Sequence, residues 1–140
     1  MKKSLIVLIC ICLTALCGCS AENEFTAENH SWKFAYVQSG ESGDILYASE
    51  ESQSVYDGEK VIDLSCTAEN GIITITNDST GEAWKIAYTV NNTLGESTVY
   101  DITYNGISGN AAVGKTTYLD ESFEYTFVIV IDGYSLCFTD

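Results

Sequence analysis

Apolar and polar side chains alternate with a period of two along most of the chain after residue 30. Residues 84–90 place a large apolar side chain at every second position, with Lys85 and smaller residues between them. Residues 32–36 repeat the pattern with Trp32, Phe34 and Tyr36. Because successive side chains of a β-strand point to opposite faces, this period predicts strands with one buried face.

The predicted strands are short and are separated by turn residues. They are Trp32–Gln38, Ile45–Ala48, Val61–Thr67, Ile72–Asn77, Ala83–Val90, Thr98–Tyr104, Ile107–Val113, Glu124–Ile131 and Tyr134–Thr139. Asn70-Gly71, Asn105-Gly106 and Asp132-Gly133 favour two-residue hairpin turns, whose central residues take positive φ. Residues 49–60 are predicted to form either a short helical turn or a loop, and no segment after residue 30 has a convincing helical stripe.

This succession of hairpins predicts an all-β fold, an antiparallel meander. About eight or nine strands remove their exposed edges most simply by closing into a barrel, and a two-sheet β-sandwich is the alternative. Trp32 and Trp84 alternate with apolar residues in strands of similar pattern, so we expect both to face the interior.

The first predicted strand begins with His30-Ser31-Trp32. A tryptophan at this place, followed by a β-meander and a C-terminal strand, resembles the lipocalin-like (calycin) barrels, whose first-strand motif is G-x-W; the tryptophan matches and the glycine does not. Residues 31–140 also resemble small uncharacterised lipoproteins of Firmicutes, through Thr116-Thr117-Tyr118 and the terminal run 133–138. The barrel family implies a cavity for a small ligand.

The N-terminus is typical of an exported lipoprotein. Lys2 and Lys3 precede an apolar stretch that is too short to span a bilayer but suits a signal peptide. Residues 16–19, Leu-Cys-Gly-Cys, resemble a lipobox in which Cys19 is lipidated and becomes the mature N-terminus. We therefore expect a palmitate-type anchor on Cys19 that holds the protein to the cell membrane on its extracytoplasmic side.

Three parts of the chain follow from this pattern. Residues 1–18 are predicted to be the lipoprotein signal peptide, 19–30 the lipidated cysteine with a polar, acidic tether, and 31–140 the β-barrel domain. His30, the only histidine, lies at the end of the tether, where we expect it to be solvated. A lone base on a tether is poorly placed for nucleophilic catalysis.

The chain after residue 18 is strongly acidic. It carries four lysines, no arginine and all 20 acids, a net charge of −16. Such a charge argues against nucleic-acid binding, which needs clustered lysine and arginine to neutralise phosphates. It fits the solubility of an exported protein, and it would also suit a cationic partner.

Cys66 and Cys137 are the only cysteines of the predicted domain. Two thiols in an exported chain favour a disulfide, but strand alternation places Cys66 among apolar residues and Cys137 among polar ones. The pair is therefore either a disulfide or two thiols on opposite faces of the barrel. Neither cysteine belongs to a C-x-x-C motif, so neither a redox nor a zinc site is predicted.

No recognisable catalytic or cofactor motif appears along the chain, and a metal site is not predicted. The run 78–82, Asp-Ser-Thr-Gly-Glu, has oxygens at suitable intervals for calcium, but turn chemistry selects the same residues. We therefore expect no enzyme and no cofactor, but a membrane-anchored binding module for a small apolar ligand or a protein partner. The alternative is an acidic inhibitor or scavenger of cationic host proteins such as lysozyme or antimicrobial peptides.

Overall fold

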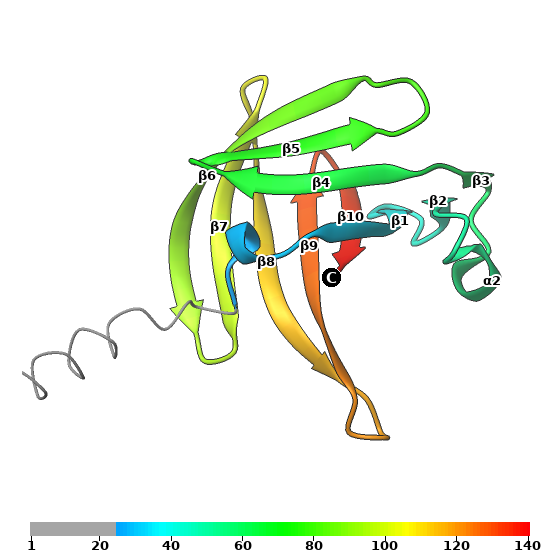
Figure 1. Cartoon of the computed structure of the whole chain (residues 1–140). Helices are drawn as coiled ribbons and strands as arrows, with labels where there is room; N and C mark the ends of the chain where they lie inside the picture. The colour runs from blue at the N-terminus through cyan, green and yellow to red at the C-terminus, as the bar shows by residue number, and fades with distance from the viewer. Residues whose placement is uncertain (1–24) are drawn as a thin grey trace, which may run out of the picture.

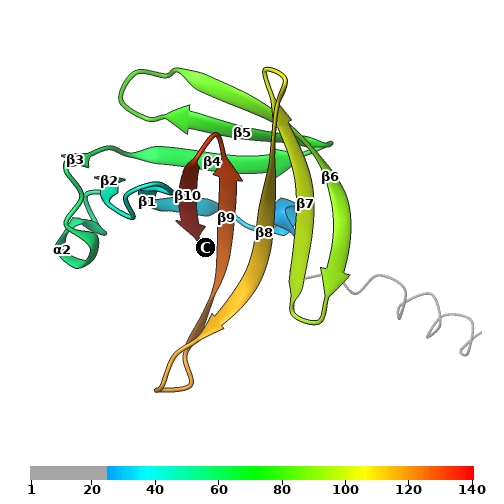
Figure 2. The same cartoon turned by 180° about the vertical axis from the view of Figure 1, so that it is seen from behind.

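Eight antiparallel strands close into a barrel in the computed structural model, which describes residues 25–140 (Figure 1; Figure 2). The elements are η1 (Ala27–Asn29), β1 (Trp32–Ser39), β2 (Ile45–Ala48), α2 (Gln53–Tyr56), β3 (Lys60–Val61), β4 (Leu64–Glu69), β5 (Ile72–Asn77), β6 (Ala83–Leu94), β7 (Ser97–Tyr104), β8 (Ile107–Thr117), β9 (Phe123–Ile131) and β10 (Tyr134–Thr139). The barrel runs in the order β1-β4-β5-β6-β7-β8-β9-β10, and β10 pairs with β1 to close it. The predicted all-β fold and barrel closure are confirmed.

Three hairpins of the barrel have the two-residue turns that the sequence predicts. Asn70, Asn105 and Asp132 have φ of 51°, 49° and 50°, and the glycine after each also has positive φ. The flanking residues pair directly across each turn, as Ile131 does with Tyr134. Asparagine, aspartate and glycine tolerate this left-handed conformation, so these turns set the register of β4–β5, β7–β8 and β9–β10.

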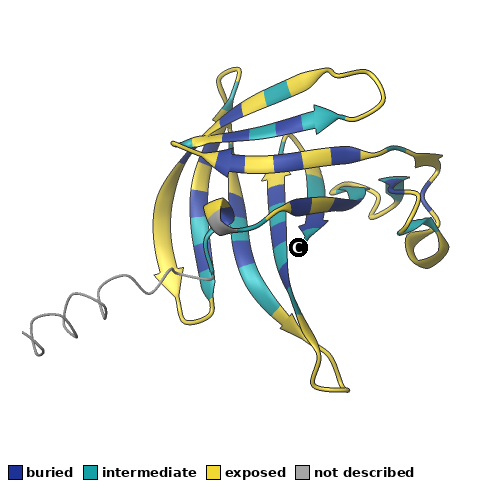
Figure 3. Cartoon of the chain, in the orientation of Figure 1, coloured by how far each residue is buried: buried dark blue, intermediate teal, exposed yellow. Residues whose placement is uncertain are grey.

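Alternating burial along the strands defines the barrel interior (Figure 3). Trp32 is only 3% exposed, packs against Phe127 with ring centroids 5.2 Å apart, and donates its indole N–H to the carbonyl of Ala27 at 2.8 Å. Trp84 also belongs to the inward-facing set, packed against the core but only partly buried. Both tryptophans therefore face the interior, in different surroundings.

The predicted strand Val61–Thr67 is wrong in its extent, because the structure divides this region. Lys60–Val61 forms β3, which pairs in parallel with β2, whereas Leu64–Glu69 forms β4 within the barrel. β1 pairs with β4 only at Trp32 and Lys33, and with β2 further along at 36–38. The chain is thus not a strict meander: the segment β2-α2-β3 is inserted where β1 and β4 separate.

Residues 25–30, assigned to the tether from sequence, pack against the barrel. Ala27 has no exposed surface, and its N–H donates to the hydroxyl of Tyr100 at 2.9 Å. Tyr88 donates its hydroxyl to the Glu28 carboxylate, and the Phe25 ring meets the Tyr125 ring edge-on. We call residues 25–30 the plug, because they cover one end of the barrel.

His30 is not a solvated tether residue, contrary to expectation. Its side chain is 11% exposed and lies against the rings of Trp32 and Tyr125, with centroids 4.8 and 4.6 Å away. Its Nδ1 lies 3.3 Å from the Asp140 carboxylate. Histidine therefore helps to hold the two ends of the described chain together beside the plug.

Cys66 and Cys137 are both free and buried in the structure, so the disulfide left open by the sequence is not formed. Cys66 belongs to the core inside the barrel. Cys137 lies between Leu136 and Phe138, both of which face the interior, so its own side chain faces outward. Burial raises the pKa of the Cys66 thiol to about 12, and that of Cys137 is also raised by burial.

Candidate functional site

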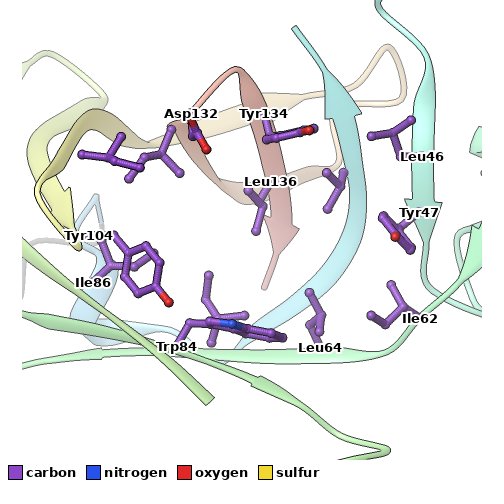
Figure 4. A pocket seen from close by; sticks show the side chains of 14 residues that line it. Leu46, Tyr47, Ile62, Leu64, Trp84, Ile86, Tyr104, Asp132, Tyr134 and Leu136 are labelled. Carbon is purple, nitrogen blue, oxygen red and sulfur yellow. The ribbon is translucent and has the colours of Figure 1, made fainter. Parts of the chain in front are cut away.

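The interior is hollow at the end of the barrel opposite the plug. A cavity of about 600 Å³ opens there, among the ends of the strands that are remote from η1 (Figure 4). Its lining residues are Val37, Leu46, Tyr47, Ile62, Leu64, Ile75, Trp84, Ile86, Tyr104, Ile107, Ile131, Asp132, Tyr134 and Leu136. Aliphatic and aromatic side chains dominate, so the cavity offers chiefly apolar contact area.

The separation of β1 from β4 makes room for this cavity. At the plugged end the two strands pair through Trp32 and Lys33, and the core between them is filled. Beyond that point the inserted segment β2-α2-β3 replaces the missing contact. Leu46, Tyr47 and Ile62 come from this segment and form one side of the cavity (Figure 4).

Backbone hydrogen bonds hold the inserted segment in place. Ser49 N–H donates to the carbonyl of Ala35 at 3.0 Å, and Ile62 N–H donates to the carbonyl of Ala48 at 2.9 Å. Gly58 lies so close to β2 that a Cβ atom at this position would stand 2.8 Å from the backbone nitrogen of Ala48. The wall is therefore attached to β1 through β2, and β3 is attached in turn to β2.

Five lining residues carry polar atoms. Four of them are aromatic, Tyr47, Trp84, Tyr104 and Tyr134, and Figure 4 shows them on different sides of the cavity. The fifth, Asp132, lies beside Tyr134 at the β9–β10 turn, and among residues 25–140 it is the only charged residue of the lining. An apolar cavity with a few polar groups is the usual composition of a small-molecule site.

The sequence identified only part of this site. The alternation pattern correctly predicted that Trp84 faces inward. It did not predict that Asp132, Tyr104 and Tyr134 line the same cavity as Trp84. What these residues share in the sequence is a position in or beside a two-residue turn, since residues 104–107 and 131–134 form the β7–β8 and β9–β10 turns with their flanking residues. Hairpins alternate between the two ends of an antiparallel barrel, so these two turns lie at the same end.

The other candidate groups lie away from the cavity or outside the described residues. Cys19, the predicted lipidation site, and the predicted signal peptide fall within 1–24, which the structure does not describe. In the run 78–82, Asn77 Oδ1 accepts the N–H groups of Ser79 and Thr80 at 3.0 and 3.1 Å, and Ser65 donates its hydroxyl to Asp78. Within residues 25–140, no three side chains of histidine, cysteine, aspartate or glutamate gather as metal ligands would.

No helix in the described part of the chain has the length and apolar character needed to cross a bilayer. Comparisons with protein-family models, with curated proteins and with solved structures found no match to this chain.

Proposed function

We propose that this protein is a non-enzymatic binding module that takes a small, largely apolar ligand into the open end of its barrel. The cavity carries this proposal. Its volume of about 600 Å³ falls within the ~300–1,000 Å³ typical of small-molecule sites. Burial of apolar ligand surface there would supply ~25 cal/mol per Å², the main favourable contribution to binding.

The location proposed with this function is the outer side of the cell membrane. The charged N-terminus, the short apolar run and Cys19 in a lipobox-like sequence support a lipidated anchor there, as in the small Firmicutes lipoproteins that the chain resembles. A lipid-anchored binding module would keep its ligand close to the cell surface.

Fluorescence of the neutral probe N-phenyl-1-naphthylamine tests the proposed ligand binding. The core, the plug and the cavity all lie within residues 25–140, so residues 20–140 can be produced without the anchor and checked by circular dichroism. We expect saturable enhancement of probe fluorescence with one site per chain, and little change between low and high salt, because apolar contacts are not screened.

Two glutamate substitutions locate the site. Leu46→Glu puts a charge on the cavity wall and should abolish probe binding, because an ionised carboxylate is costly to enclose in an apolar space. Val61→Glu, in the paired strand β3 at a position 54% exposed, is the matched control and should bind normally. Absence of saturable binding in the folded wild type, or equal binding by both variants, would contradict the proposal.

A further inference from the structure

Asp132 contributes a carboxylate to the cavity that the fold itself does not require. It occupies the first central position of the β9–β10 turn, with φ 50°. Asn70 and Asn105 hold the same position in the other two-residue turns, with φ 51° and 49°. An asparagine therefore satisfies this backbone conformation equally well, and the negative charge at Asp132 is an addition to the turn chemistry.

The carboxylate of Asp132 is also available to a ligand. Within residues 25–140 it has no hydrogen-bond donor and no cationic partner. The remaining lining contains no lysine, arginine or histidine. An anionic group of a ligand would meet one negative charge and no positive charge at this site, whereas a cationic group would find its counter-charge on the cavity rim.

Four aromatic rings of the lining favour the same kind of ligand. In the described chain none of Tyr47, Trp84, Tyr104 and Tyr134 packs against another aromatic ring. Ring faces attract cations, with tryptophan the strongest, by ~0.5–1 kcal/mol when exposed and ~2 kcal/mol when desolvated. Quaternary ammonium groups in particular bind to rings arranged around a pocket.

The surroundings of the opening add a longer-range preference. The loops 40–44 and 78–82 each contain two acids and no base, the turn 132–133 contains one acid, and the inserted segment 45–62 contains four acids and one base, Lys60. Charge of one sign around a cleft raises the local concentration of oppositely charged ligands and the rate of their association. This field would repel a fatty acid and attract an alkylammonium ion.

We infer that the occupant of the cavity is an amphipathic cation: an apolar body inside the barrel and an ammonium group at the rim, next to Asp132 and the ring of Tyr134. This inference rests on the proposed ligand-binding function and narrows the class of ligand. It excludes anionic amphiphiles as the preferred occupants.

Three probes with ten-carbon chains test the inference: decyltrimethylammonium, decanol and decanoate. Each is titrated below its aggregation limit, both calorimetrically and by displacement of N-phenyl-1-naphthylamine from residues 20–140. We expect the cation to bind best and decanoate worst. Asp132→Asn should weaken binding of the cation by about twofold to fivefold, as expected for a solvent-exposed ion pair, and should leave binding of decanol unchanged.

Glu96→Gln is the matched control for this charge removal. Glu96 is exposed in the turn between β6 and β7 at the plugged end, so its loss changes the net charge equally but leaves the cavity lining intact. The cation preference should persist in this variant.

The outcomes separate the two proposals. Failure of every probe, including the naphthylamine, would overturn the binding function itself. Equal binding of the three ten-carbon probes would leave the binding function standing and overturn the cation preference. The assignment of the cation's counter-charge to Asp132 would be overturned in two cases. Either the preference for the cation persists in Asp132→Asn, or Glu96→Gln reduces this preference as much as Asp132→Asn does.

Discussion

The two ends of the barrel are made from the same strands with the same alternation, yet one end is filled and the other is hollow. At the plugged end the ring of Phe127 packs against the rings of Trp32 and Tyr100. Ala27, which has no exposed surface, covers this part of the core. At the open end Trp84 and Tyr104 face a cavity instead. Alternation thus determines which face of a strand is inward, but not whether the inward space is occupied.

The difference comes from how the strands converge. β1 and β4 pair directly at the plugged end and are separated at the open end by the inserted segment. Paired strands lie about 4.8 Å apart, so where β1 and β4 pair directly the barrel is narrow and the inward side chains fill it. Where β2 and β3 widen the wall, the same kinds of side chain no longer meet across the interior.

The largest expected effect of this difference is on Trp32. Trp32→Ala should lower the free energy of unfolding by about 3–5 kcal/mol, because it opens a cavity in a filled core and removes a buried hydrogen bond to Ala27. Urea denaturation followed by circular dichroism measures the change. A loss of less than about 1 kcal/mol, as is typical of a surface substitution, would show that the plugged end is not the stabilising core.

Trp84 should respond differently from Trp32. Its side chain is half-buried and already faces open space, so Trp84→Ala should cost only about 0.75–1.5 kcal/mol, half the value for full burial of a large apolar side chain. Binding of the naphthylamine probe should weaken at the same time. Equal destabilisation by the two tryptophan substitutions, with unchanged probe binding, would remove the distinction between the ends.

The smallest effect at neutral pH concerns Tyr88, at the plugged end. Burial, followed by the hydrogen bond to Glu28, raises the pKa of its phenol above the ordinary value of 10. A raised folded-state pKa contributes stability that is complete below the unfolded pKa, and this stability declines as the pH rises above about 10. Denaturation between pH 8 and pH 11 should therefore show a smaller alkaline loss in Tyr88→Phe than in the wild type. An identical pH dependence would contradict this role.

Local patterns predicted the two-residue turns and most of the strands, with the region 61–67 as the exception, whereas the site depended on contacts between distant segments. Asn-Gly and Asp-Gly pairs specify their turns within four residues, so the hairpins at 70–71, 105–106 and 132–133 were predictable. The plug has no apolar period: its main core residue is Ala27, whose burial depends on Tyr100, 73 residues away. The position of Asp132 at the cavity likewise depends on barrel closure and on the inserted segment.

The plug also sets how the barrel would stand on a cell surface. With the proposed lipid on Cys19, the six residue steps to Phe25 span at most about 20–22 Å, against roughly 36–40 Å for a tether that continues to His30. With such an anchor the attachment point would be the sealed end, and the opening would point away from the lipid headgroups. A ligand would reach the cavity from the surrounding medium and not by lateral movement out of the bilayer.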